Sequence, residues 1–184
     1  MTVDWQTMSS ETPLRRPDNS LDPEGEFPLG APEYFFYLLF QATRQRDVHF
    51  GERLAATGLD LAQWRTLAII RRIDSCTMTS LARHSTIERT TLTRAVDQLV
   101  GRGIVTRWVP DSDRRQVSLA LTDAGEEVYG RAVAVLMHRN REVLADIESK
   151  DLRTASRVLQ AVLRQLLGDE KLSEEILSFG RPGG

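Results

Sequence analysis

The fold is decided by residues 77–122, which read TMTSLARHSTIERTTLTRAVDQLVGRGIVTRWVPDSDRRQVSLALT. Thr77 can cap a short helix, Ser85–Ile87 suits a tight turn, and a second helix is expected from about Glu88 to Val100. Gly101 lies where that second helix should end. The pattern therefore predicts two short helices joined by a tight turn, which is a helix-turn-helix.

A hairpin is predicted directly after the second helix. Two runs, 104–109 and 117–121, have the period of two that is typical of a strand. In the first, Val105, Arg107 and Val109 alternate with Thr106 and Trp108. In the second, the apolar positions are Val117, Leu119 and Leu121. The segment between these runs, 110–116, contains proline, aspartates and two arginines. A helix-turn-helix followed by a wing with a basic tip is a shape that binds duplex DNA.

Longer helices are predicted on both sides of this segment. Pro32 can open a helix that reaches about Ala56, and Asp60 can cap the next helix with Gln63 as its capping-box partner. Thr122 can cap a long helix that reaches about Ser149, and a last amphipathic helix follows it. The expected fold class is mainly α with a small β-wing.

Charge is unevenly distributed along the chain. The whole chain carries a net charge of −2, but ten arginines and only five acids lie between Arg65 and Arg115. That segment is therefore basic, and the remainder of the chain is acidic. One basic face on an acidic body suits a module that binds nucleic acid.

Composition narrows the remaining classes of function. Cys76 is the one cysteine, which excludes an internal disulfide framework, and the N-terminus lacks the apolar core of a signal peptide. The longest apolar run, 34–40, is too short to cross a bilayer, so we expect a cytoplasmic protein without a membrane partner. No nucleophile motif, phosphate-binding glycine loop or metal-binding histidine pair is present, so we expect no enzyme activity, metal or cofactor.

A set of spaced residues gives the chain a family resemblance over roughly residues 33–168. The set comprises Leu81-Ala82, Leu92-Thr93-Arg94, Asp97, Leu99, Gly103-Ile104-Val105, Arg107, Asp113-Arg114-Arg115, Leu121-Thr122 and Gly125. The chain resembles the MarR family of winged-helix transcriptional regulators. The resemblance implies a winged helix-turn-helix flanked by N- and C-terminal dimerisation helices. Residues 1–31 are rich in proline and polar residues with little apolar periodicity, so we expect a flexible extension or a partner-dependent arm there. Beyond it, the resemblance implies a helical dimerisation region (32–60 plus 123–170), a DNA-binding domain (61–122) and a C-terminal tail (171–184).

The candidate DNA contacts lie on the second helix, the turn before it and the wing tip. Small hydroxyl side chains and arginines on the outward face of a helix suit the major groove, because bulky side chains would hold the helix off the bases. The candidates are Ser85, Thr86, Arg89, Thr90, Thr91, Thr93, Arg94, Asp113, Arg114 and Arg115. The resemblance implies that Arg115 or Arg114 enters the minor groove and that Asp113 steers it. Asp97 would repel phosphate, so we expect it near Arg94 or beyond the DNA.

Plainer interpretations of these residues remain open. The helix face could be an ordinary solvated surface, and the wing tip an ordinary turn, because proline and aspartate are common in turns. Cys76 could be a redox sensor, although a small buried residue would also fit its place.

The resemblance also implies a small-molecule effector, such as an aromatic carboxylate, bound between the dimer helices and the winged helix. Arg46, His49, Trp64 and Arg65 are the candidate ligand-binding residues. The alternative for Trp64 is a place in the core, because it lies on an amphipathic stripe.

The basic helix-turn-helix and wing predict a DNA-binding protein. The resemblance implies that it is a homodimeric, sequence-specific regulator, more often a repressor, that leaves a pseudo-palindromic operator when its effector binds. The alternative is a winged helix that binds a protein partner and has no affinity for DNA.

Overall fold

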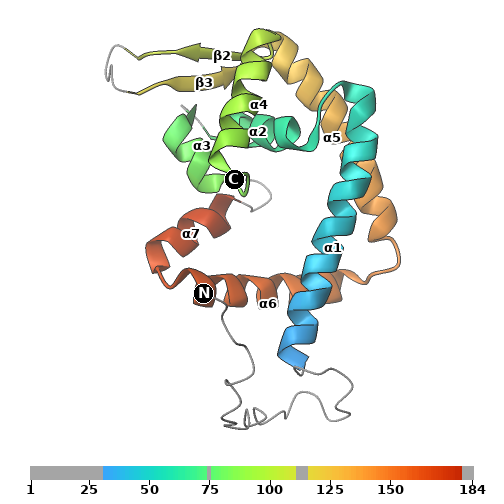
Figure 1. Cartoon of the computed structure of the whole chain (residues 1–184). Helices are drawn as coiled ribbons and strands as arrows, with labels where there is room; N and C mark the ends of the chain where they lie inside the picture. The colour runs from blue at the N-terminus through green and yellow to red at the C-terminus, as the bar shows by residue number, and fades with distance from the viewer. Residues whose placement is uncertain (1–30, 74–75, 111–115, 180–184) are drawn as a thin grey trace, which may run out of the picture. The chain divides into compact units, whose positions relative to one another are not determined.

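The computed structural model describes residues 31–73, 76–110 and 116–179. The described residues belong to two units that divide after Arg46, so residues 31–46 and 47–179 are treated separately. Helix α1, Ala31–Leu54, crosses this division. The other elements (Figure 1) are η2 Ala55–Thr57, α2 Leu61–Arg72, β1 Cys76–Thr77, α3 Met78–His84, α4 Arg89–Gly101, β2 Val105–Trp108, β3 Ser118–Leu121, α5 Asp123–Val143, α6 Ser149–Leu167 and α7 Glu170–Phe179.

The predicted helix caps of the winged helix are confirmed. The Asp60 carboxylate accepts a bond of 2.7 Å from the Gln63 backbone N–H, and the Gln63 side-chain oxygen accepts a bond of 3.2 Å from the Asp60 backbone N–H. Thr77 caps α3 with Ser80 as its partner, and Thr122 caps α5. Such caps satisfy backbone N–H groups that have no partner inside the helix, and so they fix where each helix begins.

A small sheet forms the wing and its base. Strand β3 lies between β1 and β2 and is antiparallel to both. The predicted hairpin corresponds to β2 and β3, with Val105 opposite Leu121 and Trp108 opposite Ser118. The third strand, β1, was not predicted, because two residues are too few to give an alternating pattern.

The core of the larger unit lies where α2, α3, α4, α5 and the sheet meet. The predicted inward face of α4 is confirmed, because Leu92, Val96 and Leu99 are buried. Gly125 at the start of α5 allows a close approach, since a Cβ there would lie only 2.1 Å from the Ile104 carbonyl oxygen. Helix α4 and the wing are therefore held on one packed body.

The C-terminal region differs from the sequence expectation. The helix expected to reach about Ser149 ends earlier, with α5 at Val143, and α6 begins at Ser149. A further helix, α7, occupies most of the segment expected to be a tail. Two sets of large apolar side chains remain exposed: in the larger unit Met137, Val143, Leu144, Ile147, Val158, Leu159 and Leu166, and on residues 31–46 Tyr34, Phe36, Tyr37, Leu38, Leu39 and Phe40.

Candidate nucleic-acid interface

The outward face of α4 carries the predicted contact residues. The side chains of Arg89, Thr90, Thr93, Arg94 and Asp97 line one shallow hollow on the surface. All five residues are exposed, and the buried leucines and valine of α4 occupy the opposite face. The structure therefore presents two cations and two hydroxyl groups on one exposed helix face.

Glu88 caps this helix rather than forming part of it. Its carboxylate accepts bonds from the backbone N–H groups of Thr90 at 2.8 Å and Thr91 at 3.1 Å. These bonds stabilise the charged form and lower the pKa of Glu88 below its usual range. Glu88 thus fixes the first turn of α4, which carries Arg89 and Thr90, and the two N–H groups offset its own negative charge.

Asp97 is paired with an arginine of the wing. Arg107 on β2 donates to the Asp97 carboxylate at 2.7 Å. Asp97 also lines the hollow beside Arg94, where the sequence placed it. The sequence did not indicate the Arg107 partner, because only the fold brings β2 next to α4. The pair joins α4 to the wing and offsets the negative charge of Asp97 on the exposed face of α4.

The turn before α4 holds the other described candidates. Ser85 ends α3, and its hydroxyl oxygen accepts a bond of 3.0 Å from the Ile87 backbone N–H. Thr86 and Thr91 are exposed, and the Thr93 hydroxyl donates to the Arg89 carbonyl oxygen at 3.0 Å. The wing-tip candidates Asp113, Arg114 and Arg115 lie outside the described residues.

A polar network that the sequence did not reveal links α4 to α2. The Gln63 amide donates to the Gln98 side chain at 2.8 Å. The Arg102 guanidinium donates to the Gln63 side chain at 3.2 Å and to the Gly58 carbonyl oxygen at 2.9 Å. Because Gly58 ends the 3-10 turn after α1, the network connects the C-terminal end of α4 to the turn between α1 and α2.

The candidate ligand residues have separate partners. The Trp64 ring stacks on Tyr129 at 5.6 Å between centroids and is partly buried against the core, and Arg65 bonds to Asp47 at 2.6 Å. His49 lies 3.7 Å from Glu52. Arg46 belongs to the other unit, residues 31–46.

Cys76 fits the interpretation of a small buried residue better than that of a redox sensor. The side chain is fully buried in the core, and this burial raises the pKa of the thiol above its usual value. A buried thiol with a raised pKa is a poor nucleophile, so Cys76 has the character of a packed core residue.

Two other kinds of site were sought among the described residues. Within residues 31–73, 76–110 and 116–179, no group of three histidine, cysteine, aspartate or glutamate side chains could hold a metal ion. In the same described part of the chain, no helix is both long and apolar enough to span a bilayer.

The chain is similar in sequence to known regulators. The MarR family model matches residues 59–117. The homoprotocatechuate degradative operon repressor of Escherichia coli is 25% identical over 122 residues, which are 66% of this chain and 82% of the relative. The uncharacterized HTH-type transcriptional regulator YwoH of Bacillus subtilis is 28% identical over 132 residues, which are 72% of this chain and 96% of the relative.

Solved structures share the fold. A MarR family regulator from Silicibacter pomeroyi superposes with a TM-score of 0.68 at 26% identity, covering 78% of this chain and 97% of that one. A mutant of MarR from Escherichia coli, solved with operator DNA, gives 0.63 at 24% identity over 69% and 91% of the two chains. A MarR family protein of Mycobacterium tuberculosis, in complex with p-aminosalicylic acid, gives 0.57 at 24% identity over 68% and 95%. The expected fold class is confirmed.

Proposed function

We propose, from the match of residues 59–117 to the MarR family model and the likeness to MarR family regulators, that this chain is a MarR family regulator: a cytoplasmic homodimer that represses transcription from a pseudo-palindromic operator. A small anionic aromatic ligand releases it. The chain is a regulator rather than an enzyme. The observation that carries the proposal is the exposed face of α4, where Arg89, Thr90, Thr93 and Arg94 surround one hollow.

The chemistry of this face suits base recognition. Arginine can donate two bonds to the major-groove edge of guanine, and threonine can reach bases or the methyl group of thymine. The Glu88 cap and the Asp97–Arg107 pair hold the helix in place and reduce repulsion of phosphate by the two acids. A related structure contains operator DNA, which supports the same partner for this chain.

A homodimer would cover the apolar surface that this chain leaves exposed. In the larger unit, α6 has no buried residue, although Val158, Leu159 and Leu166 are apolar. Residues 31–46 of α1 expose a second apolar set. A two-fold dimer would present two α4 helices to successive major grooves, about one helical turn apart.

A bound ligand would act by changing the distance between the two α4 helices of the dimer. Arg65 offers a cation, Trp64 an aromatic surface and His49 an imidazole ring, which suit an aromatic carboxylate. The anion could replace Asp47 as the partner of Arg65. The relative bound to p-aminosalicylic acid supports this ligand class. A shift of a few ångströms would break simultaneous contact with both half-sites.

A reporter gene behind the DNA upstream of this chain's own gene tests the sign of regulation. We expect lower expression when the chain is present and recovery when p-aminosalicylate is added. A Trp64→Phe variant should still repress but respond less to the ligand. Higher expression with the chain present would make it an activator. A response unaffected by changes at both Trp64 and Arg65 would place the ligand elsewhere.

A further inference from the structure

Helix α7 turns back from the end of α6 toward the helix-turn-helix. Gly168 ends α6 in the left-handed conformation, with φ of 63°, which glycine adopts without strain. Asp169 then begins α7: its carboxylate accepts from the Leu172 backbone N–H at 2.9 Å, and its carbonyl oxygen accepts from the Ser173 hydroxyl at 2.7 Å. Ser173 is buried, so this turn is a packed feature and not a loose end.

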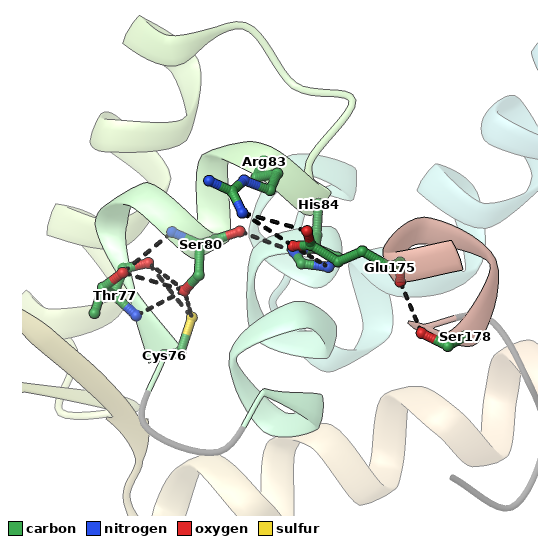
Figure 2. A network of polar contacts seen from close by, with 7 residues as sticks. All are labelled: Cys76, Thr77, Ser80, Arg83, His84, Glu175 and Ser178. Atoms are coloured by element: carbon green, nitrogen blue, oxygen red, sulfur yellow. Dashed lines mark hydrogen bonds and ion pairs between the residues drawn. The ribbon is translucent and has the colours of Figure 1, made fainter. Parts of the chain in front are cut away.

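Glu175 of α7 contacts the last turn of α3 (Figure 2). Both of its carboxylate oxygens accept bonds of 3.3 Å from the Arg83 guanidinium. One of them lies 3.6 Å from Nε2 of His84. The other ring nitrogen of His84, Nδ1, is 3.0 Å from the Ser80 carbonyl oxygen. Because a carbonyl oxygen only accepts, this contact is a hydrogen bond in the tautomer with the proton on Nδ1, and it leaves Nε2 on the side of Glu175.

Phe179 makes the second attachment of α7. Its ring lies 4.5 Å from the ring of His84, between centroids, and it packs against the core. The Arg72 guanidinium at the end of α2 lies 5.3 Å from the centre of the same ring. Helix α7 thus touches both α3 and α2, near the point where α3 leads into the turn before the recognition helix.

We propose that α7 is a strap that positions the helix-turn-helix relative to α6, with Glu175 and Phe179 as its positioning residues. The inference rests on the proposed function, in which α6 is a dimerisation helix and α4 reads DNA. The other end of α3 is fixed by Thr77, Ser80 and Cys76, so Glu175 and Phe179 fix the end nearest α4. The strap therefore sets the distance between the two α4 helices of a dimer.

A positioning role for α7 and a purely electrostatic role predict different effects on DNA binding. A rigid strap restricts the dimer to one spacing of half-sites, so it raises affinity for the operator and leaves general affinity for phosphate unchanged. If α7 acted only by its negative charge, losing any one of its glutamates would strengthen binding to every duplex. Glu174 distinguishes the two roles. It lies on α7 and carries the same charge as Glu175, but it pairs with Arg164 of α6 at 3.3 Å.

The test compares Glu175→Ala with Glu174→Ala in the full chain. A duplex selected from random sequences by the wild-type protein serves as operator, beside a shuffled duplex and a copy with one base pair inserted between the half-sites. We expect Glu175→Ala to lose at least about fivefold in preference for the operator over the shuffled duplex, and to tolerate the insertion better than wild type. Glu174→Ala should stay within about twofold of wild type. Glu175→Gln, which keeps an acceptor for Arg83, should recover most of the preference.

Hydrogen exchange of the α3 amides provides a measurement that needs no DNA. Faster exchange around Leu81–Ser85 in Glu175→Ala, but not in Glu174→Ala, would support the strap. Equal exchange in both variants, or equal changes on operator and shuffled DNA, would overturn it. If the wild-type protein selects no sequence at all, the proposed function fails, and hydrogen exchange still decides whether α7 fastens α3.

Discussion

Arg107 on the wing holds the Asp97 carboxylate of the recognition helix at 2.7 Å. Asp97 is the acidic side chain that lines the hollow formed with Arg89 and Arg94, and it would otherwise repel a phosphate backbone. The pair therefore offsets an unfavourable charge and also joins two elements that contact DNA in winged helices.

The first prediction concerns this pair. Arg107→Ala should weaken binding to every duplex by about three- to tenfold, because it leaves Asp97 unpaired next to phosphate. Asp97→Asn should strengthen binding, and the double variant should bind better than Arg107→Ala alone. Anisotropy titrations of the four proteins on one duplex measure the effect. A double variant no better than Arg107→Ala would mean that Arg107 acts on DNA directly.

The second prediction concerns the cap of α4 and its dependence on pH. The backbone N–H groups of Thr90 and Thr91 lower the pKa of Glu88 in the folded chain. Its charge therefore contributes stability above the pKa of an unfolded glutamate, and this contribution is lost as the pH falls through the lower folded value. Glu88→Gln should be less stable than wild type at pH 7, and the two stabilities should converge in acid.

Urea unfolding at several pH values measures this convergence. Glu127→Gln on α5 is the control, since no pair of helix N–H groups bonds to that carboxylate in the described part of the chain. A difference between wild type and Glu88→Gln that stays constant from pH 7 into acid would contradict the account.

The third prediction concerns Gly125. A Cβ at this position would lie 2.1 Å from the Ile104 carbonyl oxygen and 3.2 Å from Cβ of Leu121, so Gly125→Ala should lower the free energy of unfolding by roughly 2 kcal/mol or more. A Cβ at Gly130, in the same helix, would meet no atom within 4 Å apart from its chain neighbours and the helix's own backbone. Gly130→Ala should instead stabilise the chain by about 0.5–1 kcal/mol. Equal stability of the two variants would show that the close approach is absent.

The fourth prediction concerns the dimer. Changing Leu159 and Leu166 of α6 together to glutamate should give a monomer of 20.8 kDa in sedimentation measurements. Operator binding should then fall, because only one half-site can be engaged. Arg157→Ala alters the opposite side of the same helix and should leave the oligomeric state unchanged. If the leucine variant keeps the mass of wild type, the dimer does not use this face of α6.

Local signals in the sequence predicted the parts of the fold that depend on neighbouring residues. The caps Asp60, Thr77 and Thr122 and the buried face of α4 follow from side chains a few residues apart. The end of α5 at Val143 was missed, because the residues after it contain neither glycine nor proline to mark a stop.

Contacts between distant residues could not be predicted in this way. Two ion pairs form only because the fold brings their elements together. They are Arg107 with Asp97 and Arg83 with Glu175. Helix α7 itself carries an amphipathic pattern after Gly168, and that signal could have indicated a helix but not its partner. The exposed arginines and threonines of α4 could be predicted, because the sequence indicated both the helix and the face of it that is buried.

The most direct test of the account is fluorescence anisotropy across a salt series, with the selected operator and a shuffled duplex, for wild type and Arg94→Ala. The account predicts salt-sensitive binding by wild type with a clear preference for the operator. Arg94→Ala should lose about 1–3 kcal/mol on the operator, a factor of roughly five or more, and much less on the shuffled duplex. Equally weak binding of wild type to both duplexes, unchanged by the loss of Arg94, would contradict DNA recognition by α4 and favour a protein partner.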